Sequence, residues 1–342
     1  MTYPDRNAIV KPKTDLFFLF HHKINVTRRF KRQTMTIGST TLFLLFCFYL
    51  LCWNVTQSFA FFPRKVIHNC AQQSTLLCLQ RHDKSDSKTQ QGLYQPFVQS
   101  AWTKLGQVLT PIELSNNFDT RSAVAKGMPD GTIVNITVAA MQGRTPESPI
   151  RYARYALLET LLPGLPETTS GIQVLNLVIF PNGNFPVWGV DLVSLPGDRH
   201  LLAMDVQPMS SAPLPMTDSW KAWHTKHVEN TFDWGGDLPL EAAKYFSPYG
   251  LWTRLTGPKG IYQIQTQVME AFDEHLDLYL NMMTKLSTTT TITTTESSPT
   301  NSGYQSEYLD YRLANDPARP MLKSLYGAEW TEQLLTEVLF PK

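Results

Sequence analysis

Apolar residues recur at strand spacing through the middle of the chain. Between Val174 and Phe180, alternate residues fall on two faces, and both faces are apolar. The same holds for Val187–Leu195 and Leu201–Val206, which a turn over residues 196–199 joins as a hairpin. A sheet that is apolar on both sides has to be covered on both sides, and short turns make it antiparallel. The pattern predicts an α/β fold, a three-layer α/β/α sandwich with a central, largely antiparallel sheet.

The helical cover is predicted mainly in the C-terminal half of the chain. From Ile261 to Met283, apolar residues recur at steps of three and four, and acidic residues occupy the other side. Such a stripe is typical of a helix that packs on a core, and a partner-binding helix is the alternative. Residues 304–315 and 330–339 are predicted as further helices. The Thr-rich residues 287–302 predict a mobile surface insertion that does not continue the preceding helix.

The N-terminal part of the chain has the pattern of a targeting sequence. Residues 41–53 form an apolar run that is short for a membrane span and suits the core of a signal peptide. Small residues at Ser58 and Ala60 predict cleavage before Phe61, and a basic stretch follows. We expect a signal peptide at residues 1–60, with an overlong start before Met35, and a transit peptide at residues 61–92. A membrane anchor at residues 41–53 is the alternative.

A signal peptide followed by a transit peptide that begins with Phe resembles the two-part leader of algae with secondary plastids. The predicted location is therefore the plastid (chloroplast), and we expect no stable membrane span in the mature protein. The remaining residues 93–342 are long enough to bury the core of one large domain.

Charge is divided unevenly along the chain, although the net charge is only +1. Residues 1–92 carry 13 Lys and Arg against 4 Asp and Glu, whereas residues 93–342 carry 17 against 25. A nucleic-acid partner needs a basic face that displaces counterions from phosphates. The acidic domain therefore argues against nucleic acid as a partner.

The domain offers few groups for cofactor or metal chemistry. The four cysteines of the chain all lie before residue 93, so residues 93–342 can form neither a thiolate nucleophile nor an iron–sulfur ligand set. His224, His227 and Glu229 do not have the i, i+4 spacing of a zinc site. No GxGxxG motif follows a strand, which disfavours a Rossmann dinucleotide or flavin site.

Carboxylates remain as candidates for chemistry. Asp191 shares a strand face with Val193, where a charge is costly unless it is paired or used, and burial would raise its pKa toward that of a proton donor. A salt bridge to a neighbouring arginine is the alternative. Asp205, on the next strand, is a weaker case of the same kind. Asp316 precedes a proline between two helical segments, which is typical of a helix N-cap.

Several strings of residues resemble one known family. They are Gly189–Pro208 (GVDLVSLPGDRHLLAMDVQP), Phe246–Leu255 (FSPYGLWTRL), Asp316–Arg319 (DPAR) and Tyr311–Phe340, in this order along the chain apart from the nested DPAR. From about Trp102 to its C-terminus the chain resembles the ferredoxin-dependent bilin reductases.

The resemblance implies an enzyme that holds an open-chain tetrapyrrole between the sheet and the C-terminal helices. It implies no bound cofactor, flavin or metal, since electrons arrive singly from reduced ferredoxin and the bilin itself holds the unpaired electron. The protein would deliver protons in a water-poor pocket. By alignment with the family's motifs, Asp191 and Asp316 are the expected proton donors. For Asp316 the capping and catalytic roles are compatible.

The resemblance also implies substrate contacts. Asn176 stands where the members that make phycocyanobilin carry histidine, which points away from phycocyanobilin synthesis. Arg254 and Arg319 are expected to bind the two propionates, because guanidinium groups pair bidentately with carboxylates. Surface salt bridges are the alternative for both arginines.

The strings look most like those of members that reduce the A-ring diene of 15,16-dihydrobiliverdin to phycoerythrobilin. The alternatives are a sister enzyme that reduces biliverdin at its 15,16 bridge, a more distant phytochromobilin synthase and a bilin carrier without redox activity. Ferredoxin is the expected partner, and a sister bilin reductase or a phycobiliprotein lyase are further partners that this reading suggests.

Overall fold

We obtained a computed structural model of the protein. It describes residues 92–115, 117–125, 131–161, 171–183, 185–208, 214–238, 240–290 and 303–342. The predicted signal peptide, the predicted transit peptide up to residue 91 and residues 291–302 of the predicted insertion lie outside the described residues.

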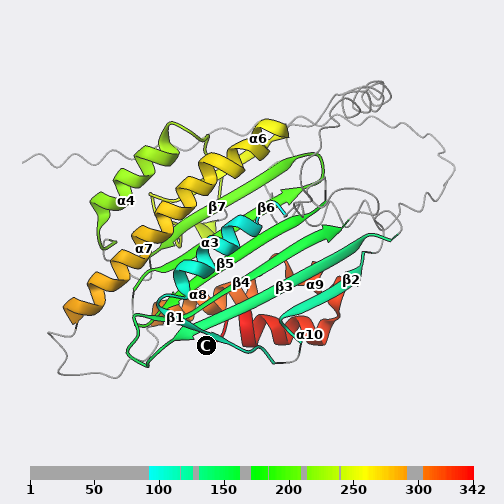
Figure 1. Ribbon diagram of the computed structural model, residues 1–342, viewed down its shortest axis with the longest axis horizontal. Helices are drawn as coiled ribbons and strands as arrows, with labels where there is room; N and C mark the ends of the chain where they lie inside the picture. The colour runs from blue at the N-terminus through cyan, green and yellow to red at the C-terminus, as the bar shows by residue number, and fades with distance from the viewer. Residues whose placement is uncertain are drawn as a thin grey trace, which may run out of the picture. The chain divides into compact units, whose positions relative to one another are not determined.

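In the described part of the chain, eight strands form one sheet (Figure 1). The strands are β1 (Leu109–Ile112), β2 (Thr120–Val124), β3 (Ile133–Gly143), β4 (Ile150–Leu161), β5 (Gln173–Pro181), β6 (Val187–Leu195), β7 (Arg199–Gln207) and β8 (Leu251–Thr256). Their order is β1-β3-β4-β5-β6-β7-β8, with β2 also on β3, and every pairing is antiparallel. The predicted sheet is confirmed.

Helices cover both faces of this sheet (Figure 1). One layer holds α3 (Gln95–Leu105), α4 (Thr217–His224), α6 (Gly257–Gln263) and α7 (Met269–Thr290). The opposite layer holds α8 (Gly303–Ala314), α9 (Arg319–Tyr326) and α10 (Ala328–Gln333). A short helix, α5 (Leu240–Ala243), and the π-helical segments η1 (Thr225–Glu229), η2 (Ile264–Val268) and η3 (Leu334–Leu339) complete the set. The three-layer sandwich is confirmed.

The sheet separates two apolar cores. On one face, strand residues such as Leu177 and Trp188 pack against α7 residues such as Phe272. On the other face, Val138 and Val178 belong to the core that α8–α10 and η3 close. Each buried side chain of this size contributes about 1.5–3 kcal/mol when it leaves water. Burial on both faces accounts for the doubly apolar strands seen in the sequence.

The predicted helices are found, with one difference at the insertion. Residues 257–290 run continuously through α6, η2 and α7, and α8 matches the predicted helix at residues 304–315. However, α7 ends at Thr290, so residues 287–290 of the predicted insertion are helical. Thr and Ser cost only about 0.5 kcal/mol each in a helix, and propagating an existing helix costs far less than nucleating one.

The predicted β6–β7 hairpin is also found. Leu195 pairs with Arg199 across the turn, and Gly197 (φ 82°) and Asp198 (φ 50°) take the left-handed conformation that the turn requires. The register that this turn sets places Asp191 opposite Ala203. Among the described residues, none of the helices combines the length and the apolarity that crossing a membrane requires.

Candidate active site

The antiparallel register gathers polar side chains on the sheet face that α8–α10 cover. Asn176 on β5 lies directly opposite Asp191 on β6, and Asp191 lies opposite Ala203 on β7. Because side chains alternate along a strand, Asp205 shares this face with Ala203. Two of the three candidate acids, Asp191 and Asp205, thus lie on neighbouring strands of one face, and the third, Asp316, lies between α8 and α9, which cover that face.

Two cavities lie against this face. With their open mouths included, they enclose about 350 and 520 Å³ of space. The first cavity has a wall of both polar and apolar residues, which include Asp205, Gln207, Tyr308 and Phe246. The second has a largely apolar wall that includes Ile136, Leu158, Leu322 and Leu339, together with Asp316. Asn176, Asp191 and Arg312 line both cavities, so these three residues mark the boundary between them.

Opposing effects act on the carboxyl group of Asp191. Its side chain is 41% exposed, yet it opens into the two cavities, so loss of bulk solvent dominates and raises its pKa. Arg312, whose Nη2 lies 3.9 Å from Oδ2, and a hydrogen bond from the side chain of Asn176 oppose that rise. Asp316 adds to it by repulsion. The arginine partner expected in the alternative reading is therefore present, but at a distance too long for a hydrogen bond.

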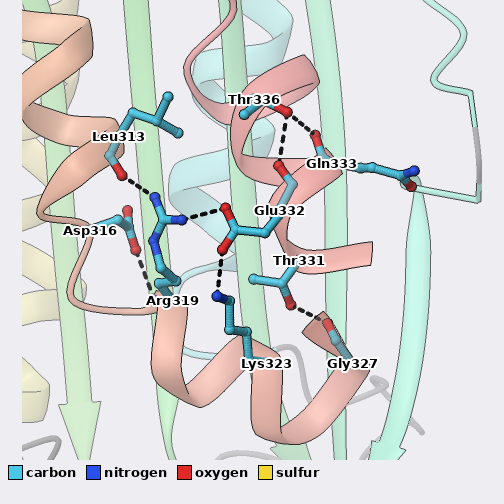
Figure 2. Close-up of polar contacts among 9 residues, drawn as sticks. All are labelled: Leu313, Asp316, Arg319, Lys323, Gly327, Thr331, Glu332, Gln333 and Thr336. Atoms are coloured by element: carbon cyan, nitrogen blue, oxygen red, sulfur yellow. Dashed lines mark hydrogen bonds and ion pairs between the residues drawn. The ribbon is translucent and has the colours of Figure 1, made fainter. Parts of the chain in front are cut away.

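Asp316 lies in the turn before α9, two residues ahead of the N-cap residue Ala318, so the predicted N-cap position is shifted by two residues. Its Oδ1 accepts hydrogen bonds from the backbone N–H groups of Ala318 (2.8 Å) and Arg319 (3.1 Å) at the start of α9, and the contact to Arg319 appears in Figure 2. The same side chain lines the second cavity. These hydrogen bonds fix the carboxyl group at the cavity wall, within the electrostatic reach of Arg312.

Arg319 lies in a different environment from the one expected of a propionate ligand. Its guanidinium donates to the carboxylate of Glu332 and to the carbonyl of Leu313, as Figure 2 shows. Lys323 Nζ also lies 2.6 Å from Glu332. Arg319 is absent from the walls of both cavities. The structure thus shows Arg319 in a salt bridge, the alternative to propionate binding: in the first turn of α9 its side chain is directed to α10, and it links the C-terminal helices.

Arg254 is exposed on β8, opposite Leu201, and it too is absent from the walls of both cavities. The register nevertheless places it on the same sheet face as Asp191, because its neighbour Trp252 pairs with Ala203. Arg254 is therefore a residue of the sheet edge, outside the described cavities.

Two arginines that were not predicted from the sequence, Arg312 and Arg154, lie at the site. Arg312 lines both cavities, and Arg154 on β4 is completely buried beside Asn176. The ring of Phe340 lies 5.4 Å from the guanidinium carbon of Arg154 and 5.6 Å from that of Arg312. A signal existed for Arg312, because it lies near the end of the predicted helix at residues 304–315, only four residues before Asp316.

Asp205 is more distinctive in the structure than in the sequence. It is 1% exposed, and its two oxygens accept hydrogen bonds from the N–H (2.7 Å) and hydroxyl (2.5 Å) of Ser247. Burial raises its pKa to about 7 despite these bonds. Gly250 fits closely above it, since an added Cβ would lie 2.7 Å from Oδ1. Asp205 thus anchors the FSPYG segment and also supplies a second acid to the first cavity.

A possible metal site among the described residues lies elsewhere, on the α4–α7 layer. One ligand atom each from His227, Glu270 and Glu274 comes within 4.8 Å of the others. Lys226 occupies the same place, with Nζ 2.6 Å from Glu274 and 3.9 Å from Glu270. An ammonium group already balances these carboxylates, so the cluster is an ion-pair network. His224 and Glu229 are not part of it.

Comparison with known proteins shows the family to which the chain belongs. The family model described as "Ferredoxin-dependent bilin reductase" matches residues 99–341. The chain belongs to this family. It is an oxidoreductase of the ferredoxin-dependent bilin reductases, a family whose members act on bilins.

Relatives of this protein include the phycoerythrobilin:ferredoxin oxidoreductases of two cyanobacteria. That of Nostoc punctiforme is 34% identical over 260 residues, which cover 72% of this chain and 92% of the relative. That of Synechococcus sp. strain CC9311 is 33% identical over 282 residues, which cover 77% and 99%. The solved structure of tomato phytochromobilin synthase in complex with biliverdin has a TM-score of 0.54 at 19% identity, covering 72% of this chain and 82% of that one. This likeness supports the fold.

Replacing Arg319 with methionine tests the structural role of its guanidinium. We expect Arg319→Met to lower the free energy of unfolding by about 1–3 kcal/mol, because charge-assisted bonds to Glu332 and Leu313 are lost. Bilin affinity should stay within about twofold, which absorbance titration measures. Lys323→Met is the matched control: it removes the other cation on Glu332 and should cost about 1 kcal/mol or less. A large loss of affinity at unchanged stability would return Arg319 to the substrate site.

Proposed function

We propose that this enzyme reduces the A-ring diene of 15,16-dihydrobiliverdin and yields phycoerythrobilin. Two electrons come one at a time from reduced ferredoxin, two protons come from the protein, and no bound cofactor takes part. Support for the product comes from the names of the relatives, which are phycoerythrobilin:ferredoxin oxidoreductases. Asn176, in the place of a histidine, gives further support.

The observation that carries the proposal is the position of Asp191. It lies at the boundary of both cavities, its pKa is raised, and a hydrogen-bond donor and a cation flank it. A carboxylic acid whose pKa is raised is better suited to general acid catalysis than one with the ordinary value. We assign Asp191 to one proton transfer and Asp316, at the wall of the second cavity, to the other.

Arg312 serves both acids in this scheme. Each proton transfer leaves a carboxylate behind, and Arg312 interacts favourably with both Asp191 and Asp316. Its Nε has no hydrogen-bond partner among the described residues, so the guanidinium retains donor capacity for a bilin propionate or lactam oxygen. Arg254, exposed at the edge of the same sheet face, is the candidate for a propionate that extends beyond the cavities.

The leader supports a plastid location for this reaction. We infer that residues 1–92 direct the protein to a plastid and are removed in two steps, the signal peptide before Phe61 and the transit peptide after residue 92. N-terminal sequencing of the native protein should find a first residue near position 93. A chain that still contains residues 41–53 would instead indicate a membrane anchor and would contradict the inference.

The substrate is tested by offering biliverdin and 15,16-dihydrobiliverdin separately to the protein under anaerobic conditions with reduced ferredoxin. We expect the absorbance of dihydrobiliverdin alone to be replaced by that of phycoerythrobilin. Consumption of biliverdin would identify a reductase of the 15,16 bridge. Tight binding of both pigments without turnover would identify a carrier and remove the catalytic roles of the aspartates.

Asparagine at either aspartate tests proton donation. Asp191→Asn and Asp316→Asn should each lower kcat by about 10²–10⁴-fold while bilin affinity is retained, since the shape of the side chain is kept. In the wild type, kcat should fall as pH rises through the pKa of Asp191, because only the protonated acid donates. Asp198→Asn, in the β6–β7 turn away from both cavities, is the control and should leave kcat unchanged.

A further inference from the structure

A buried guanidinium lies behind the candidate proton donor and does not belong to either cavity wall. Arg154 is 0% exposed. Its Nε donates to the carbonyl of Leu339 (3.1 Å), and its Nη1 donates both to the backbone carbonyl of Asn176 (3.1 Å) and to the side-chain Oδ1 of Asn176. Burial and the nearby Arg312 lower its pKa to about 10, so it stays protonated at neutral pH.

These contacts fix which end of the Asn176 amide faces which neighbour. A guanidinium has donors only, so the atom of Asn176 that faces Arg154 has to be the oxygen. The NH₂ group is then left on the other end of the amide, and the side chain of Asn176 is hydrogen-bonded to Asp191, its direct partner in the β5–β6 register. Without Arg154, either end of the amide could face Asp191.

We propose that Arg154 is a positioning residue, which holds the side-chain amide of Asn176 with its NH₂ group toward Asp191. The guanidinium of Arg154 is itself held in place by two C-terminal residues. It donates a hydrogen bond to the carbonyl of Leu339 and lies over the ring of Phe340. Packing of the C-terminal segment thereby reaches Asp191 through two side chains. The consequence for turnover rests on the proposed function, whereas the arrangement itself does not.

Several other charged or titratable groups lie around Asp191. They face it from each packed element: Arg154 on β4, Asp205 on β7, Tyr308 and Arg312 on α8, and Asp316 before α9. Of these described groups, Arg154 is the one that donates a hydrogen bond to the amide oxygen of Asn176.

The direction of the effect follows from the hydrogen bond. An N–H donor stabilises the carboxylate form of Asp191, so the fixed amide holds its pKa below the level that burial alone would give. When the amide is free to turn, its oxygen can accept a hydrogen bond from the protonated acid. Loss of Arg154 should therefore raise the pKa of Asp191 by about one unit.

A pH titration of the carboxyl stretching band of Asp191 by infrared difference spectroscopy measures this shift in ligand-free protein. The band is assigned as the one that Asp191→Asn removes. Four proteins are compared: wild type, Arg154→Met, Asn176→Leu and the double variant. The readout needs no turnover, so a failure of the proposed reaction and a failure of this inference remain distinguishable.

The double variant separates the two routes by which Arg154 can act. We expect Arg154→Met and Asn176→Leu each to raise the pKa of Asp191 by about one unit, and the double variant to show no further rise. If Arg154→Met raises the pKa just as much in the Asn176→Leu background, its charge acts directly across space and the proposal is overturned. Asn176→Leu keeps the bond from Arg154 to Leu339, so it remains decisive if Arg154→Met does not fold. No shift in that variant overturns the proposal.

Tyr152→Phe is the matched control for a purely structural role. Tyr152 lies on the same strand, and its hydroxyl donates to the carbonyl of Val338 (3.0 Å), next to the Leu339 carbonyl that Arg154 binds. Both variants should lower the melting temperature, because both release the C-terminal segment. Only Arg154→Met should move the pKa of Asp191, and a comparable shift in Tyr152→Phe would overturn the proposal. In active protein, the alkaline limit of the kcat profile should move with the infrared pKa.

Discussion

The sheet has two apolar faces, and covering both of them is the constraint on which the rest of the structure depends. One face is sealed by the layer that contains α7, where Trp188 and Phe272 lie in a continuous core. The other is closed by α8–α10 and η3, and there the strands carry Asn176, Asp191 and Asp205 among apolar neighbours. Polar groups in such a face keep the cover from closing completely, and the two cavities lie where these groups meet the helices.

The charges at this site balance one another without forming tight ion pairs. Three acids and two arginines lie around the cavities, yet Asp191 and Arg312 are 3.9 Å apart, and Arg154 is bonded to amide and carbonyl oxygens. A tight pair would hold the carboxylate ionised and remove its use as an acid at neutral pH. The loose arrangement keeps the pKa of Asp191 above its ordinary value, and it leaves a cation close by for the charge that proton transfer creates.

Much of the fold could be predicted from the sequence, and less of the site. Apolar periodicity gave the antiparallel sheet, the β6–β7 hairpin and the C-terminal helices, whereas the end of α7 at Thr290 could not be read from propensity alone. Asp191 and Asp316 came from motifs and lie at the cavities. Arg319 also came from a motif, but it does not line either cavity. Membership of a motif does not determine the direction of a side chain, which the contact with Glu332 decides. A role for Arg154 could not be predicted, because strand alternation alone does not tell which face of the sheet is directed to the site.

Family membership and fold place limits on what distinguishes one bilin reductase from another. The likeness to tomato phytochromobilin synthase has a TM-score of 0.54 at only 19% identity, so a shared backbone is compatible with very different sequences. If the bilin carries the electron, the bond that is reduced depends on which carbon receives a proton, and hence on the position and protonation of a few acids. Residues behind the cavity, such as Arg154, set those properties through hydrogen bonds without touching the substrate. Differences in selectivity within the family should therefore be sought in the partners of the aspartates as much as in the cavity walls.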